Sequence, residues 1–146
     1  MTHNLETKKN STIIDARGPR FGAVITTAVL ATALATNSLW VIAAQAIVFA
    51  IGAIKGPQFT PYAFIYKTLV KPRLKGEAPA EDVRPPQFAQ TVGLLFALAG
   101  LLGAAIGSAA VFNVAVGFAL AAAFLNAAFN YCLGCQMYLL ILRARF

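Results

Sequence analysis

Charged residues are scarce in this sequence, and their scarcity limits the class of protein. Only 12% of the 146 residues are Asp, Glu, Lys or Arg, which is about half of what a soluble domain carries, whereas 59% are hydrophobic. Two long segments, residues 21–54 and 88–142, contain no charged residue. We therefore expect one domain of an integral membrane protein, most of whose surface contacts lipid rather than water.

Several patterns that would point to a particular chemistry are missing. There is no G-x-G-x-x-G, P-loop or H-E-x-x-H pattern, and the predicted spans lack the ionisable residues that mark proton or ion pathways. The single histidine, His3, lies in the polar N-terminal tail and cannot supply a pair of metal or haem ligands. The tail also lacks the hydrophobic core of a signal peptide. These absences disfavour a pump, an NTPase and a metalloprotease.

The spacing of polar residues predicts four membrane spans. The predicted spans cover about residues 21–36, 39–54, 88–106 and 112–131, and an apolar stretch over 132–142 follows them. The first uncharged segment is too long for one span, which needs about 20 residues, so we place a turn at Asn37-Ser38. A second turn is expected around Ser108. The fold class we expect is all-α, an integral membrane four-helix bundle formed by residues 21–142.

The positions of the basic residues predict the orientation in the membrane. All 12 Lys and Arg fall in the tail and the turn into the first helix (1–20), in the loop over 55–87, or at the C-terminus. Four spans put these three regions on one side, and the positive-inside rule makes that side cytoplasmic. We therefore expect a multi-pass protein of the cell (plasma) membrane with both termini in the cytoplasm. The net charge of +7 then reflects topology and anionic lipid, not nucleic-acid binding.

The central loop contains a helix signal. Thr60 and Pro61 have the residue types of an N-cap and a first helical position, and Pro72 is expected to end the helix. Lys67 and Lys71 lie off an apolar stripe at helical spacing, which consists of Tyr62, Ile65, Tyr66 and Leu69. We expect an amphipathic helix on the membrane surface with this stripe in the lipid. The alternative is a loop helix packed against the protein.

A short internal repeat accompanies the predicted spans. Residues 17–21 and 84–88 share the pattern R-x-P-x-F, and each copy directly precedes a predicted hairpin of two spans. Two hairpins in the same orientation imply a pseudo-two-fold axis along the membrane normal. The repeat therefore favours a bundle made of two repeated helical hairpins.

The candidate chemical site is the pair Cys132 and Cys135, the only two cysteines, which form a C-x-x-C motif. The spacing permits a disulfide, but the cytoplasm keeps ordinary thiols reduced, so we expect no stable structural disulfide. The alternatives are a redox-active dithiol, an inert pair, and a metal site that would need more ligands from a second copy. If Asn130 caps a new helix near Tyr131, the helix dipole favours a reactive thiolate; a continuous helix would leave both thiols unreactive.

Amide side chains in the apolar segments form a second group of candidates. They are Gln45, Asn126, Asn130 and Gln136. Amides at such positions commonly form hydrogen bonds between helices, which is the interpretation we favour. They could also line a pocket for a quinone or a small anion.

These residues carry a resemblance to a known family. Segments 15–21, 84–90 and 123–138, the last ending in C-L-G-C-Q-M-Y, resemble the small actinobacterial membrane family catalogued as domain of unknown function 4395. The resemblance covers most of the chain after the tail. Members typically carry Glu at the position of Gln136, and they tend to be encoded near thioredoxin-like and thiosulfate sulfurtransferase proteins. The architecture is also similar to that of DoxX-type four-helix proteins, some of which are associated with thiosulfate oxidation and quinones.

The resemblance implies a role in thiol or sulfur chemistry. We expect Cys132 to be the attacking thiol and Cys135 the resolving thiol, exchanging with a thioredoxin-like or sulfurtransferase partner in the cytoplasm. One alternative is a non-catalytic membrane subunit with structural cysteines, which packs against a larger complex through the glycine-rich third span. Another is a carrier for a small sulfur anion. The sequence does not decide whether the protein is an enzyme.

Overall fold

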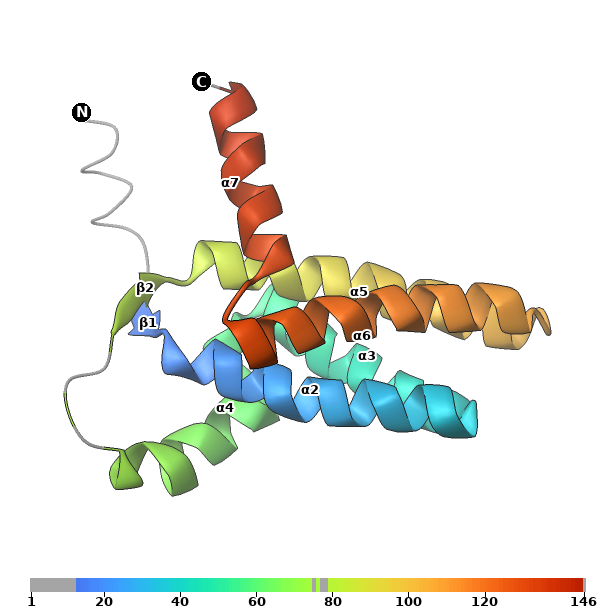
Figure 1. The fold of residues 1–146 in the computed structure, drawn as a ribbon, viewed down its shortest axis with the longest axis horizontal. Coiled ribbons are helices and arrows are strands. Elements are labelled where there is room, and N and C mark those ends of the chain that lie inside the picture. The colour runs from blue at the N-terminus through green and yellow to red at the C-terminus, as the bar shows by residue number, and fades with distance from the viewer. Residues whose placement is uncertain (1–12, 75, 77–78, 146) are drawn as a thin grey trace.

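The computed structural model describes residues 13–74, 76 and 79–145 (Figure 1). Most of the predicted tail, including His3, lies outside the described residues. In chain order the elements are β1 (Ile13–Asp15), α2 (Arg17–Thr36), α3 (Leu39–Ile54), a 3₁₀ turn (Pro57–Phe59), α4 (Pro61–Ile65), a π-helical turn (Tyr66–Val70), a 3₁₀ turn (Lys71–Arg73), β2 (Ala80–Asp82), α5 (Arg84–Ala105), α6 (Ala109–Phe129) and α7 (Leu133–Arg145). Helices α2, α5 and α6 are long and apolar enough to cross a membrane, and α3 and α7 are shorter apolar helices. The fold is therefore of the all-α membrane type predicted from composition.

The turn from α2 to α3 and the turn from α5 to α6 are built alike. Asn37 has a left-handed backbone with φ of 50°, and Ser38 caps α3 by accepting a hydrogen bond from a backbone N–H of its first turn at 3.3 Å. In the second turn Gly107 has a φ of 76°, and Ser108 caps α6 in the same way. Glycine and asparagine are the residues that adopt this conformation most readily. Helix α6 begins at Ala109, earlier than the sequence pattern suggests.

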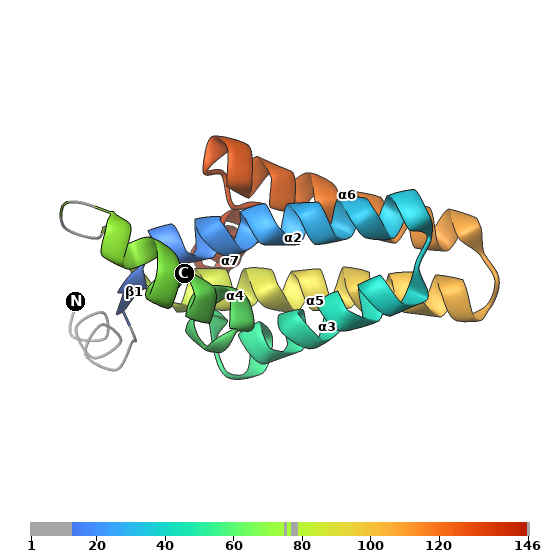
Figure 2. The ribbon, with the colours of Figure 1, turned by 90° about the horizontal axis from the view of Figure 1, so that it is seen from below.

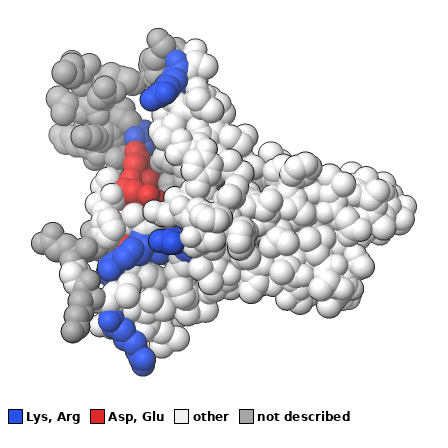
Figure 3. Space-filling view, viewed as in Figure 1, with Lys and Arg blue, Asp and Glu red and all other residues white. Residues whose placement is uncertain are grey.

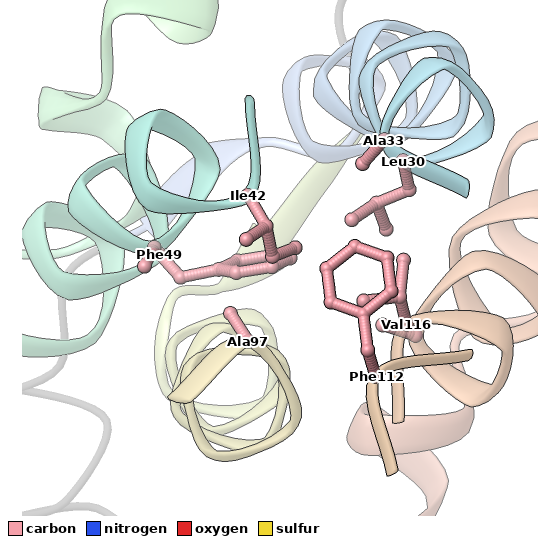
Figure 4. Close-up of a cluster of buried hydrophobic side chains, with 9 residues drawn as sticks. Leu30, Ala33, Ile42, Phe49, Ala97, Phe112 and Val116 are labelled. Carbon is pink, nitrogen blue, oxygen red and sulfur yellow. The ribbon is translucent and has the colours of Figure 1, made fainter. Parts of the chain in front are cut away.

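Helices α2, α3, α5 and α6 lie side by side along the length of the molecule (Figure 1, Figure 2). Helix α2 contacts α6, α3 contacts α5, and α5 also contacts α6. Buried apolar side chains from all four helices meet between them (Figure 4), and Leu30, Ile42 and Val116 in this cluster are fully buried. In lipid, close packing rather than hydrophobicity drives helices together, so the fit of this cluster holds the four helices in place.

Glycines let α5 approach its neighbours closely. A Cβ added at Gly93 would lie 2.6 Å from the ring of Phe49 on α3, and one added at Gly100 would lie 2.9 Å from a side chain of α6. A Cβ added at Gly103 would lie 2.6 Å from the backbone nitrogen of Phe112. The glycine-rich face of α5 is therefore used for packing inside the chain.

The four helices have an apolar outer surface, and the charges lie at one end. Exposed large side chains include Trp40, which is 80% exposed, Ile47, Leu95 and Phe118. In the view of Figure 3 the charged residues lie at the end of the molecule that carries β1, β2, the starts of α2 and α5, the segment after α4 and the tip of α7, and the opposite end shows none. A surface of this kind indicates contact with a lipid bilayer along the helices.

The segment after α3 differs from the predicted surface helix. Thr60 caps α4 as expected, but the helix continues as a π-helical turn and a 3₁₀ turn. Tyr66 is buried against Phe21, and the Tyr62 hydroxyl donates a hydrogen bond to Gln45 at 2.7 Å. The prediction that Tyr66 enters lipid is wrong, because its ring packs on Phe21 and its hydroxyl donates a hydrogen bond to Asp15 inside the protein. Tyr62 is partly buried, and its hydroxyl also finds a partner within the protein. The other two members of the stripe are exposed.

The apolar stretch over 132–142 forms a separate helix rather than an extension of the fourth one. Helix α7 leaves the other helices at the charged end and projects away from them (Figure 1). It contacts α5, and α4 contacts α2. Each hairpin is thus followed by a shorter helix that packs on the first helix of the same hairpin, α4 on α2 and α7 on α5.

A small sheet joins the two halves of the chain. Strands β1 and β2 are antiparallel, with Ile14 opposite Glu81 in the middle and Asp15 opposite Ala80 at one end. The sequence predicts a loop with one helix over residues 55–87 and no strand. A three-residue strand has too short a pattern to be detected there.

The same Asp–Arg contact starts both hairpins. The Asp15 carboxylate accepts a hydrogen bond from the Arg17 backbone N–H at 2.9 Å, and Asp82 accepts one from the Arg84 N–H at 2.9 Å. Each Arg side chain also pairs with the same carboxylate. The repeat is therefore D-x-R-x-P-x-F, longer than the pattern read from the sequence, and the antiparallel sheet relates its two copies by an approximate two-fold.

Hydrogen bonds keep both carboxylates charged. Burial raises the pKa of Asp15, but hydrogen bonds from Arg17 and Tyr66 outweigh it, so the pKa lies below its ordinary value of 3.8. The hydrogen bond with Arg84 is the main cause that lowers the pKa of Asp82 below 3.8. A lowered folded-state pKa contributes stability above the unfolded pKa, and this contribution is lost as the pH falls through the folded pKa.

We expect Asp15→Asn to lower the free energy of unfolding by about 1–3 kcal/mol, because Arg17 and Tyr66 lose a charged acceptor. The wild-type protein should lose stability below about pH 4, and the variant should lose less over that range. Thermal unfolding in detergent micelles at several pH values measures both effects. Arg73→Gln, at an exposed position, is the control. A variant with wild-type stability and pH dependence would contradict the role given to Asp15.

Candidate functional site

The chain breaks between α6 and α7, directly before the cysteine pair. Helix α6 ends at Phe129, and Asn130 has a left-handed φ of 55° while its N–H donates to the Asn126 carbonyl at 3.1 Å. Asn130 is thus the C-terminal cap of α6, and the expectation that it caps the following helix is wrong, because a left-handed backbone ends a helix rather than starting one. Of the two predicted alternatives, the structure has the broken helix.

Cys132 occupies the capping position of α7. Its carbonyl accepts a hydrogen bond from the Gln136 N–H at 3.0 Å, and its Sγ accepts one from the Cys135 N–H at 3.1 Å. The sulfur therefore lies beside the first N–H groups of the helix, where the helix dipole stabilises negative charge. When the pair is reduced, this position favours a thiolate at Cys132.

A disulfide joins Cys132 and Cys135, whose Cα atoms are 5.1 Å apart. Disulfides span such a distance, so the first turn of α7 brings the two sulfurs together without moving the backbone. The structure thus contains the oxidised form of the pair. The expectation that this bond is not a permanent structural disulfide stays a prediction. Within the part of the chain that the structure describes, no group of three His, Cys, Asp or Glu side chains could hold a metal ion.

The cysteine pair lies in the wall of a cavity of about 510 Å³ between α2, α5, α6 and α7. This volume is in the usual range for small-molecule sites. Three of the predicted amides, Asn126, Asn130 and Gln136, line the cavity together with both cysteines. The fourth, Gln45, does not, because it is buried beside Tyr62 instead. The structure therefore brings together most of the predicted polar residues and leaves Gln45 apart.

Three charged residues also line the cavity, and none of them was predicted from the sequence as a site residue. Glu81 and Asp82 come from β2, and Arg20 comes from α2. Burial raises the pKa of Glu81, and the charge of Asp82 raises it further. Arg20 donates a hydrogen bond to the Ala127 carbonyl at 3.2 Å, which links α2 to the end of α6. The one sequence signal for Glu81 is its place directly before the second D-x-R-x-P-x-F copy.

Two contacts fix α7 against α5. A Cβ added at Gly134 would lie 2.5 Å from the Cα of Ala89, so only glycine permits this approach. The ring centroids of Phe88 and Tyr138 are 5.6 Å apart in a tilted arrangement. These contacts hold the turn that carries the cysteines at the cavity wall.

The first half of the chain has a matching set of contacts. The phenylalanine that ends the first motif packs on Tyr66 with ring centroids 5.7 Å apart, as the one that ends the second motif packs on Tyr138. Thr60 caps α4 through Oγ1, and Cys132 caps α7 through Sγ. In both halves the tyrosine lies six residues after the cap. The cysteine pair therefore takes the place of an ordinary helix cap in a duplicated arrangement.

The fold and the site define an all-α protein of membrane type with a cysteine pair at the start of its last helix. The sequence matches the family described as Domain of unknown function (DUF4395) over residues 14–143. The chain belongs to this family, which confirms the resemblance seen in the sequence. No curated protein and no solved structure matches the chain. The likeness to DoxX-type proteins and the actinobacterial source stay predictions.

We expect Gly134→Ala to destabilise the protein by about 1–3 kcal/mol, because the added methyl group pushes α7 away from α5. The displaced turn should also raise the alkylation rate of Cys132 and Cys135 after reduction. Gly117→Ala is the matched control, since nothing lies within 4 Å of a Cβ added there, and helix propensity alone should make it neutral or stabilising. Equal effects of the two substitutions would contradict the close contact.

Proposed function

We propose that this protein carries out thiol–disulfide exchange at a membrane surface through Cys132 and Cys135, with a thioredoxin-like or sulfurtransferase partner. The position of the pair supports this most. The Cys132 sulfur lies beside the first N–H groups of α7, and both cysteines line a cavity. Both are also partly exposed, so a partner sulfur can reach them. A disulfide whose only role was to stabilise a turn would need neither a position at the start of a helix nor access to a cavity.

The proposed exchange has two steps. In the reduced protein the Cys132 thiolate attacks one sulfur of a partner disulfide, an S–S bond forms between them, and the other partner sulfur leaves as a thiolate. Cys135 then loses its proton and attacks Cys132 Sγ. The Cys132–Cys135 disulfide forms, and the first partner sulfur leaves as a thiolate. Two electrons have passed to the partner, and the reverse sequence reduces this protein.

The proposed membrane arrangement puts α2, α3, α5 and α6 across the bilayer as a four-span bundle of two repeated hairpins. The uncharged hairpin segments and the charges gathered at one end support it. The positive-inside rule assigns that end, with both termini and the cysteine pair, to the cytoplasmic face of a plasma membrane. Helices α4 and α7 then lie near the lipid headgroups.

A quinone cofactor stays a prediction. Its place would be the cavity beside the cysteines, whose walls change from polar at Asn126 and Asn130 to apolar at Phe96 and Phe118. The exchange with a protein partner does not require it.

The alternative is a non-catalytic subunit that docks on a larger membrane complex. In this alternative the docking surface is the glycine-rich face of the third span. Gly93, Gly100 and Gly103 of α5, however, pack against α3 and α6 within the chain. This packing weighs against docking through that face. The two candidates differ most clearly in whether the cysteines exchange with a partner.

The proposal predicts different behaviour for the two single-cysteine variants. Reduced Cys135→Ser in membrane vesicles should form a stable mixed disulfide with an oxidised thioredoxin-like protein, because no resolving thiol is left. Cys132→Ser should form it roughly tenfold more slowly, since its remaining thiol is not at the helix cap. Non-reducing gels with and without dithiothreitol measure the adduct. Equal yields from both variants, or none from either, would contradict the assigned roles.

A further inference from the structure

The duplicated halves allow an internal comparison of the residues around the cysteines. Thr60 and Ala63 in the first half correspond to Cys132 and Cys135 in the second, because in each pair the first side chain accepts a hydrogen bond from the backbone N–H of the second. The first half thus shows what this turn needs for stability alone. An ordinary hydroxyl cap and a methyl group are enough.

The sheet extends the comparison to a third position. Ile14 and Glu81 face each other at the middle of β1 and β2, so the approximate two-fold exchanges them. Ile14 and Ala63 line a smaller cavity of about 270 Å³ in the first half, as Glu81 and Cys135 line the larger one in the second. Where the first half has two apolar side chains, the second half has a carboxyl group and a cysteine sulfur in one cavity wall.

The surroundings of Glu81 do not explain a carboxylate at this position. Two other acidic residues near it, Asp15 and Asp82, are each paired with an Arg side chain. The Glu81 carboxylate has no ion pair or side-chain hydrogen bond among the described residues. It is partly buried, and its pKa is raised by burial and then by Asp82. Partial burial without a partner costs stability, so the feature calls for a functional reason.

We propose that Glu81 accepts and returns the proton of Cys135 during thiol–disulfide exchange. The inference rests on the proposed function and adds the proton path to it. In the second step the Glu81 carboxylate takes the proton from the Cys135 thiol as Cys135 Sγ attacks Cys132 Sγ. The Cys132–Cys135 bond forms, the bond from Cys132 to the partner breaks, and the partner sulfur leaves with the electron pair. In the reverse direction the carboxylic acid protonates Cys135 as it leaves.

Other groups at the cavity are less suited to this role. Asp82 is held by Arg84, and Arg20 from α2 is always charged. Helices α5, α6 and α7 contribute only amides besides the cysteines to the polar wall, namely Gln90, Asn126, Asn130 and Gln136. Across the sheet Glu81 faces the apolar Ile14. Glu81 is therefore the titratable group left to exchange a proton with the pair.

The test follows the two steps with one small disulfide, dithiobis(nitrobenzoate), added to the reduced full-length protein in lipid nanodiscs. Attack by Cys132 releases one coloured thiolate, and attack by Cys135 on the mixed disulfide releases a second. In the wild type the rate of the second release should rise with pH through the raised pKa of Glu81. In Glu81→Gln it should be roughly tenfold slower at neutral pH and rise only towards the pKa of a free thiol, about 8.5.

Three further variants separate proton transfer from a structural effect. Glu81→Asp keeps a carboxyl group, so the rate of its second release should still rise at a pH below the pKa of a free thiol. Glu81→Ile, which copies the first half, should behave like Glu81→Gln. Ile14→Gln places the same amide at the matched position of β1 and should leave both releases as in the wild type. The first release should change less than twofold in all four variants, which shows that the site still forms.

The outcomes separate this inference from the proposed function. A second release with the same rate and pH profile in Glu81→Gln and the wild type would overturn the role of Glu81 and leave the exchange reaction intact. A wild-type protein that never gives the second release, and instead keeps the reagent on its cysteines, would overturn both.

Discussion

Residues 21–54 and 88–142 contain no charged side chain, and the rest of the structure depends on that constraint. Every ion pair described lies at one end of the helices, where the Asp15–Arg17 and Asp82–Arg84 contacts start the two hairpins. Along their length the helices are held by packing, with glycines bringing α5 close to its neighbours. Polar chemistry is thereby confined to one surface, and the cysteine pair lies there.

The two halves of the chain share one local arrangement at that surface. Both halves begin with D-x-R-x-P-x-F, both follow their hairpin with a short helix, and both pack a tyrosine of that helix on the motif's phenylalanine. The cap of the short helix satisfies backbone N–H groups in either half. A sulfur at that position keeps the capping contact and adds a nucleophile beside the positive end of a helix. The first half keeps the structural version, with Thr60 as the cap.

Composition was sufficient to predict the membrane class, and the motifs were sufficient to predict the family. The turns at Asn37-Ser38 and around Ser108 and the capping role of Thr60 could also be predicted, since local backbone preferences decide them. Asn130 was misjudged because asparagine suits both an N-terminal cap and a left-handed C-terminal one. A helical stripe looks the same whether it faces lipid or protein, so the burial of Tyr66 could not be read from spacing.

Other parts of the site depend on contacts between segments far apart in the chain. Glu81 lies in a segment that reads as a loop, and only its pairing with β1 places it at the cavity wall. The position of Cys132 at the cap of α7 depends on the break after α6. Neither feature has a periodic sequence signal, because each is set by tertiary structure rather than by local preference.

The central claim is that Cys132 and Cys135 form a reversible redox couple rather than a permanent brace. Its most direct test is differential alkylation of both cysteines in native membranes equilibrated with a series of glutathione buffers. The account predicts a two-electron transition between dithiol and disulfide near the cytosolic glutathione potential, roughly −320 to −220 mV. A pair that stays fully oxidised below this range, or fully reduced above it, would contradict the account and favour structural cysteines.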